Sequence, residues 1–434
     1  MLGAFVNAFK TPDLRRKLLF VLLIIVLFRL GSMVPAPGVN VPNVQECINL
    51  ASAGENSGLF ALINVFSGGA LLQLTVFALG IMPYITASII LQLLVVVIPR
   101  LESLKNEGQA GQTKITQYTR YLTLGLAILQ ATGIVALARS GGLFQGSCDL
   151  PLLYREDSIA SFLLIVTTMV AGTVMIMWFG ELITDRGVGN GMSLMIFTQI
   201  VATFPGAMWL IKEQKGWTTF TIVVIVGLVI VAAVIFIEQA QRRIPVQYAR
   251  RMVGRKMFGG SSTYIPLKVN QAGVIPVIFA SSLMYLPALA AQFNPTAPWS
   301  GWVNDNLVQG DHPVYMISFF ALIVFFTYFY VAITFNTVEV ADNMKKYGGF
   351  VPGIRAGKPT EEYLSYVLSR ITAPGATYLG LISLIPLMAF VLIQANQNFP
   401  FGGVTILIIV GVGLDTVKQI ESQLQQRNYE GFLR

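Results

Sequence analysis

Charge is what this sequence has least of. Lys, Arg, Asp and Glu make up 12% of its 434 residues, whereas hydrophobic residues make up 54% and the mean hydropathy is +0.67. Soluble domains carry about 25% charged residues. Because a charged side chain at the bilayer centre is costly, by about 3 kcal/mol or more, membrane spans exclude charge. Long uncharged stretches such as 71–98 and 314–335 recur along the chain, which predicts an integral membrane protein.

Residues that bind metals or act as nucleophiles are also scarce. His312 is the single histidine, and Cys47 and Cys148 are the only cysteines, too far apart for a metal-binding pattern. The sequence contains no HExxH, GxSxG, P-loop or CxxC motif. We therefore expect no metal, no cofactor and no enzymatic activity. Both cysteines fall in predicted outer loops, where a disulfide is chemically allowed, but the sequence leaves their pairing open.

Apolar runs long enough to cross a bilayer, about 20 residues each, predict ten spans. They are placed at 18–34, 71–98, 121–138, 158–183, 191–211, 218–237, 272–291, 314–335, 371–393 and 404–417. The first run follows a basic cluster as a signal peptide does, but it is longer than a signal h-region and is interpreted as a retained span. The last is the weakest, because its apolar run is short.

The basic residues are distributed very unevenly between the two sides of these spans. Of the 29 Lys and Arg residues, 24 lie on the side that carries both termini, four lie on the other side, and Arg29 lies inside the first span. Cytoplasmic loops are enriched in Lys and Arg. Both termini are therefore predicted to be cytoplasmic.

Ten spans divide into an N-terminal half, 1–211, and a C-terminal half, 212–434, with five spans each. An odd number of spans per half places the halves in opposite membrane orientation, so any duplication is an inverted repeat. A short apolar segment, 58–66, is followed by glycines and precedes the second span. It is either an interfacial helix or a re-entrant element that occupies a cavity.

Two cytoplasmic loops, 238–270 and 339–370, are unusually long. The first carries seven basic residues against Glu238 alone, and the pattern at 262–269 indicates a strand, so this loop is expected to form a hairpin. Anionic lipid headgroups explain most basic loops. The length and density of this one also suit a polyanionic partner or an acidic protein surface.

Carboxylates are nearly absent at membrane depth, since Glu181, Glu238 and Asp415 all lie at predicted span ends. Ion-coupled transporters usually place charged groups within the membrane. This pattern favours passive conduction, with a multi-span solute transporter containing broken helices as the alternative.

Several motifs spread over nearly the whole chain then point to a family. They are the segments 66–71, 77–90, 114–121, 183–191, 266–276, 341–346 and 350–355, which read FSGGAL, FALGIMPYITASII, KITQYTRY, ITDRGVGNG, PLKVNQAGVIP, ADNMKK and FVPGIR. Together they resemble the SecY family, the channel-forming subunits of bacterial Sec protein translocases.

The resemblance implies an all-α polytopic membrane protein in which ten transmembrane helices, as two inverted five-helix halves, surround a central pore closed by a short re-entrant plug helix. It implies passage of unfolded polypeptides across the cytoplasmic membrane and lateral release of transmembrane segments into lipid. The implied partners are the SecE and SecG subunits, the SecA motor ATPase, the ribosome, signal peptides, nascent polypeptides and membrane lipids.

The resemblance also implies site residues, most of which would otherwise be read as ordinary packing. The pore ring maps onto Ile81, Ile85, Ile196, Ile278 and Ile408, and the plug onto Leu59, Phe60, Leu62, Ile63 and Phe66. Candidate polar contacts across a lateral gate, formed by spans 2 and 3 against 7 and 8, are Thr86, Gln130, Ser281 and Ser282. Docking of SecA or the ribosome would use Arg242, Arg243, Arg250, Arg251, Arg255, Lys256, Lys345, Lys346 and Arg355.

Overall fold

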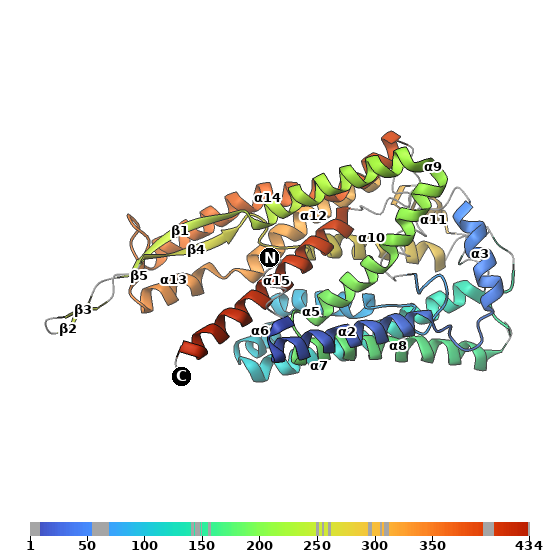
Figure 1. Ribbon diagram of the computed structural model, residues 1–434, viewed down its shortest axis with the longest axis horizontal. Coiled ribbons are helices and arrows are strands. Elements are labelled where there is room, and N and C mark those ends of the chain that lie inside the picture. Colours follow the sequence, from blue (N-terminus) through green and yellow to red (C-terminus); the bar gives the residue numbers. More distant parts are fainter. Residues whose placement is uncertain are drawn as a thin grey trace.

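The computed structural model is an elongated bundle of helices with a small β structure at one end (Figure 1). It describes residues 9–53, 69–139, 143, 148, 150–154, 158–248, 251–253, 256–258, 262–293, 297–303, 306–307, 312–393 and 403–432. Its helices are α2 (Pro12–Met33), α3 (Val41–Ala53), α5 (Met82–Val97), α6 (Pro99–Asn106), α7 (Gln109–Arg139), α8 (Ile159–Arg186), α9 (Gly191–Gln239), α10 (Ile275–Phe293), α11 (Pro298–Val303), α12 (Pro313–Thr334), α13 (Thr337–Lys346), α14 (Lys358–Ile393) and α15 (Gly403–Phe432). The strands are β1 (Gln241–Tyr248), β2 (Arg251–Val253), β3 (Lys256–Phe258), β4 (Ser262–Lys268) and β5 (Gly349–Phe350).

The predicted helical membrane class is confirmed. Each predicted span overlaps a helix or, for the fifth and sixth, one arm of α9, although only the later part of the second span is helical. Among the described residues, five helical segments are long and apolar enough to cross a membrane by themselves, and the bent pair α5–α6 makes a sixth. The count of ten spans remains a prediction.

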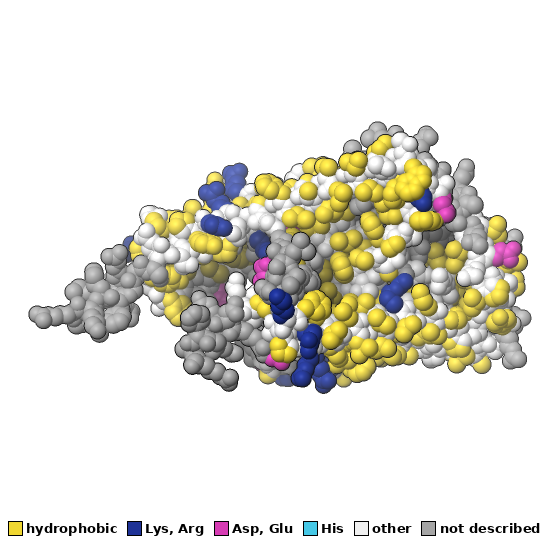
Figure 2. Space-filling view, viewed as in Figure 1, with side chains coloured by type: hydrophobic (Ala, Val, Ile, Leu, Met, Phe, Trp, Pro, Cys, Tyr) yellow, Lys and Arg dark blue, Asp and Glu magenta, His cyan; other side chains and the backbone are white. Residues whose placement is uncertain are grey.

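The side chains on the flank of the bundle are those of a protein surrounded by lipid. Phe236 is 78% exposed and Ile317 is 69% exposed. Figure 2 shows hydrophobic side chains over most of this face, with most of its Lys and Arg side chains toward the end that carries β1 and β4. Contiguous apolar surface of this kind marks an interaction surface, here with the bilayer core.

The two halves meet at a bend in α9. Gly216 has φ 78° and interrupts the helix between the predicted fifth and sixth spans. This φ lies in the left-handed region, which glycine adopts without steric cost. In Figure 1, α2, α7 and α8 lie together on one side, while α12 and α14 lie on the other and α9 connects them. The break lies near the predicted boundary between the halves.

The prediction that the second span begins near residue 71 as a helix is wrong. Residues 69–81 form successive turns, and α5 begins at Met82, with Pro83 in its first turn instead of mid-span. Proline suits this position because the first helical N–H groups have no intrahelical acceptor. The turns are supported by α2 and its continuation, since Ala36 N donates to Leu74 O and Val76 N donates to Val34 O.

The long cytoplasmic loop does form the predicted hairpin. β1 pairs antiparallel with β4, β2 pairs with β3 nearer the tip, and β5 from the second loop adds to β1. The two predicted cytoplasmic loops therefore share one sheet.

One end of the N-terminal half carries a disulfide whose pairing the sequence left undecided. Cys47 on α3 and Cys148 are bonded, with their Cα atoms 5.4 Å apart and 101 residues between them in sequence. Both are buried in the core of this half. The same segments are joined by hydrogen bonds from Asn43 Nδ2 to Pro151 O and from Asn40 N to Leu152 O.

We expect removal of this disulfide to destabilise the N-terminal half. Closing so long a loop restricts the unfolded chain, so a Cys47→Ser/Cys148→Ser variant should lose about 2–4 kcal/mol of stability. Thermal unfolding in detergent checks this. Reductant should lower the midpoint of the native protein but not that of the variant; equal midpoints for both proteins without reductant would contradict the expectation.

Candidate functional site

A cluster of branched aliphatic side chains lies where four helices from both halves converge. Ile200, Ile278 and Ile408 are buried in it, and Ile85 and Ile196 pack against them. These five residues, here named the apolar ring, come from α5, α9, α10 and α15.

The structure brings together four of the five residues predicted for the pore ring. Ile81 is 1% exposed and lies in a neighbouring cluster with Phe28, Phe77 and Phe179. Ile85 and Ile196 pack against both clusters, so Ile81 adjoins the apolar ring from its N-terminal side.

Sequence reasoning missed further members of the cluster, and helical spacing would have found them. Ile200 follows Ile196 by one turn, Val412 follows Ile408 by one turn, and Val274 precedes Ile278 by one turn. Residues four apart lie on one face of a helix. Each contributing helix after α5 therefore presents a stripe instead of a single residue.

The start of α9 is held tightly, which fixes where Ile196 and Ile200 lie. Asn190 Oδ1 accepts from Met192 N and Ser193 N, and Thr184 Oγ1 accepts from Gly191 N at 2.9 Å. A Cβ on Gly191 would collide with the carbonyl oxygen of Gly180 on α8. These contacts, at the junction between α8 and α9, keep the two helices packed together.

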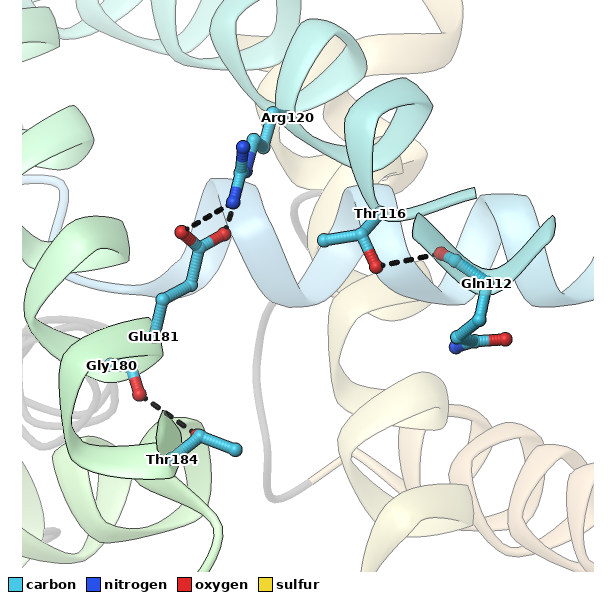
Figure 3. A network of polar contacts seen from close by, with 6 residues as sticks. All are labelled: Gln112, Thr116, Arg120, Gly180, Glu181 and Thr184. Atoms are coloured by element: carbon cyan, nitrogen blue, oxygen red, sulfur yellow. Dashed lines mark hydrogen bonds and ion pairs between the residues drawn. The ribbon is translucent and has the colours of Figure 1, made fainter. Parts of the chain in front are cut away.

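Glu181, near the C-terminal end of α8, is paired with a basic residue of a neighbouring helix. Arg120 on α7 donates from Nε and Nη2 to both carboxylate oxygens of Glu181, at 2.8 Å each (Figure 3). A bidentate Arg–carboxylate pair is a geometrically specific contact. Glu181 thus joins α7 to α8.

The helices predicted to form the lateral gate are arranged as two pairs. α5 packs mainly on α7 and α10 on α12, while α5 and α10 meet only over a narrow region. The predicted polar residues do not bridge this seam in the present conformation. Thr86 Oγ1 donates to Met82 O and Ser281 Oγ donates to Ile278 O, both within their own helices. Ser282 Oγ is buried and has no hydrogen-bond partner among the described residues, and Gln130 is half-buried.

The predicted plug residues Leu59, Phe60, Leu62, Ile63 and Phe66 lie outside the described residues. The same holds for Arg250 and Arg255. Arg251 and Lys256 belong to β2 and β3, but their side chains are outside the description.

The remaining predicted docking residues lie around one shared buried core. A buried core that includes Ile244, Leu267, Met344 and Leu364 joins the β1–β4 hairpin to α13 and to the start of α14. The exposed side chains of Arg242, Arg243, Lys345, Lys346 and Arg355 surround this core. We name the surface formed by β1, β4, β5, α13 and residues 351–358 the docking platform.

A metal centre has no visible basis in this geometry. The described part of the chain contains no group of three or more His, Cys, Asp or Glu side chains that could hold a metal ion.

Comparison with known proteins gives consistent matches. The SecY family model matches residues 75–417. The chain is 67% identical to the protein translocase subunit SecY of Streptomyces galbus and 60% identical to that of Mycobacterium bovis, with all of both chains covered in each case.

The structural matches agree in fold. The solved structure titled "The structure of a protein conducting channel" superposes with a TM-score of 0.61 at 19% identity, over 94% of this chain and 91% of that one. Sec61 in the canine ribosome–channel complex superposes with a TM-score of 0.59 at 18% identity, with the same coverage. The solute-transporter alternative finds no support in these matches.

Wetting the apolar ring should make the resting protein leak ions. A narrow apolar constriction excludes water and ions by dewetting, so Ile408→Asn, and more strongly Ile81→Asn/Ile196→Asn/Ile408→Asn, should raise resting conductance in planar bilayers. Ile408→Val keeps the site apolar and serves as the matched control. Conductance of the Asn variants equal to that of the control would count against a sealing role.

Proposed function

Because the chain belongs to the SecY family, we propose that it is the central protein-conducting channel of a Sec translocase, passing unfolded polypeptides across the bacterial cytoplasmic membrane. The observation that carries this proposal is the apolar ring at the junction of the two halves. A ring of branched aliphatic side chains seals against ions but makes no specific hydrogen bond, so polypeptides of any sequence can pass without being held. In this scheme the chain catalyses no reaction, and its bound partner, SecA or the ribosome, supplies the energy for moving the polypeptide.

Lateral release of hydrophobic segments follows from the two helix pairs. The α5–α7 and α10–α12 pairs touch narrowly, so they can separate without breaking the packing inside each pair. A signal peptide or a transmembrane segment would leave the pore by this route into lipid. Segment 58–66 is proposed as the plug that closes the pore from the outside.

The surfaces of the molecule support a proposed position for each partner. SecA or the ribosome would bind the docking platform on the cytoplasmic side, where both termini lie. The small subunits SecE and SecG would cover part of the lipid-facing flank. The likeness to a channel found in a ribosome complex supports the ribosome as one such partner.

Reconstitution tests the channel function directly. Liposomes that contain this chain with SecE and SecG should, with SecA and ATP, carry a secretory precursor into a protease-protected lumen. Omitting ATP is the control. A precursor that remains fully digestible in the complete system would exclude this function.

Reversing one charge on the docking platform should weaken motor binding. Arg355 is exposed and close to the buried platform core, so Arg355→Glu replaces attraction by repulsion and should raise the SecA dissociation constant at least about tenfold at low salt. Lys114→Glu makes the same charge change on α7, away from the platform, and is the matched control. Equal affinity for both variants would place the SecA site elsewhere.

A further inference from the structure

The docking platform meets the pore through a buried polar contact. β4 ends at Lys268 and α10 begins at Ile275. Between them, Asn270 is 3% exposed, and its Nδ2 donates to Glu238 Oε1 at 2.6 Å and to Gly273 O at 3.2 Å. One side chain thus joins the end of α9 to the start of α10.

The surrounding backbone leaves this contact little freedom. Val269 N donates to Ala240 O at 3.0 Å, which closes the base of the β1–β4 hairpin. On α14, a Cβ added to Gly375 would lie 2.4 Å from Val269 O, so α14 presses directly on this base. A movement of the hairpin base is therefore passed to the residues that lead into α10.

The contact is incompletely satisfied as it stands. Asn270 Oδ1 and the Tyr378 hydroxyl are both buried without a hydrogen-bond partner in the described part of the chain. Tyr378 lies on α14, one turn beyond Gly375. Buried polar groups without partners are unfavourable. A rearrangement in which the Tyr378 hydroxyl donated to Asn270 Oδ1 would satisfy both groups, and it defines a second arrangement of the contact.

The affected helix carries part of the pore. α10 contributes Ile278 to the apolar ring, and Val274 just before it packs against the same cluster. We propose that the Asn270–Glu238 contact is a positioning clamp that couples partner binding at the docking platform to opening of the apolar ring. The inference rests on the proposed function and assigns these residues no contact with the passing polypeptide.

A pair of substitutions at one position separates the clamp from general packing. In E238Q the amide oxygen can still accept from Asn270, whereas in E238L it cannot. In vesicles with SecE, SecG and SecA, E238L should lower the maximal translocation rate at saturating SecA about tenfold, as expected for a lost hydrogen bond to a charged group. E238Q should retain most of the rate. The SecA dissociation constant should be the same for both, because the exposed basic residues are untouched.

Further variants keep the proposal open to refutation. N270L should resemble E238L, and the double variant should be no slower than either single one. D415N removes an exposed carboxylate that pairs with Lys268 at 3.9 Å and should leave the rate unchanged. Y378F should fold normally and slow translocation about fivefold, because it removes the hydroxyl whose hydrogen bond would stabilise the second arrangement.

The clamp is refuted if E238L and E238Q have the same maximal translocation rate. It is also refuted if a raised SecA dissociation constant accounts for the lower rate of E238L. If E238L does not fold, a Y378F protein with the native rate refutes it instead. Failure of the native protein to translocate would exclude the proposed function and is a separate result.

Discussion

The structure depends on the packing of apolar side chains where its two halves meet. In a membrane an unpaired polar group has no water to bind, so an opening lined by polar atoms would fill with water and conduct ions. The apolar ring meets this constraint with isoleucines from both halves. Because aliphatic side chains interact without direction, the same contact can also open and close again without breaking specific bonds. Sealing and passage are thus served by one kind of side chain.

The same constraint explains the irregular backbone before α5. Residues 69–81 are non-helical, yet they lie at the centre of the N-terminal half, and Phe77 and Ala78 are buried. Non-helical backbone is tolerated at membrane depth only where protein satisfies it. The chain before residue 40 does this through backbone hydrogen bonds to Leu74 and Val76. The turns place Ile81 and Ile85 at the beginning of α5, where the chain changes direction and Ile85 packs against the apolar ring.

The sequence predicted what depends on average polarity and missed what depends on individual contacts. Hydropathy located the helices, and alternation located β4, because burial in lipid or in a sheet imposes a period on the sequence. The predicted helical start of the second span, near residue 71, was wrong because an apolar run does not distinguish a helix from buried turns. The Cys47–Cys148 bond could not be decided, since pairing depends on how α3 packs against residue 148. The proposed ring residues were assigned through family motifs, since any single isoleucine in an apolar span has the same local signal.

The position of the docking platform is the least predictable feature and the one that connects the parts. Its basic residues were visible in the sequence, but the core beneath them was not. Ile244 and Leu267 from one loop pack with Met344 and Leu364 from another, forming a small water-side core outside the lipid-facing bundle. Packed cores resist gradual deformation and change between discrete arrangements. In the described part of the chain, the base of the hairpin is bonded to the end of α9 through Val269 N and Ala240 O, faces Gly375 of α14 and pairs with α15 through Lys268 and Asp415. Under the proposed clamp, a displacement of this core by a partner would reach α10 through residues 269–274.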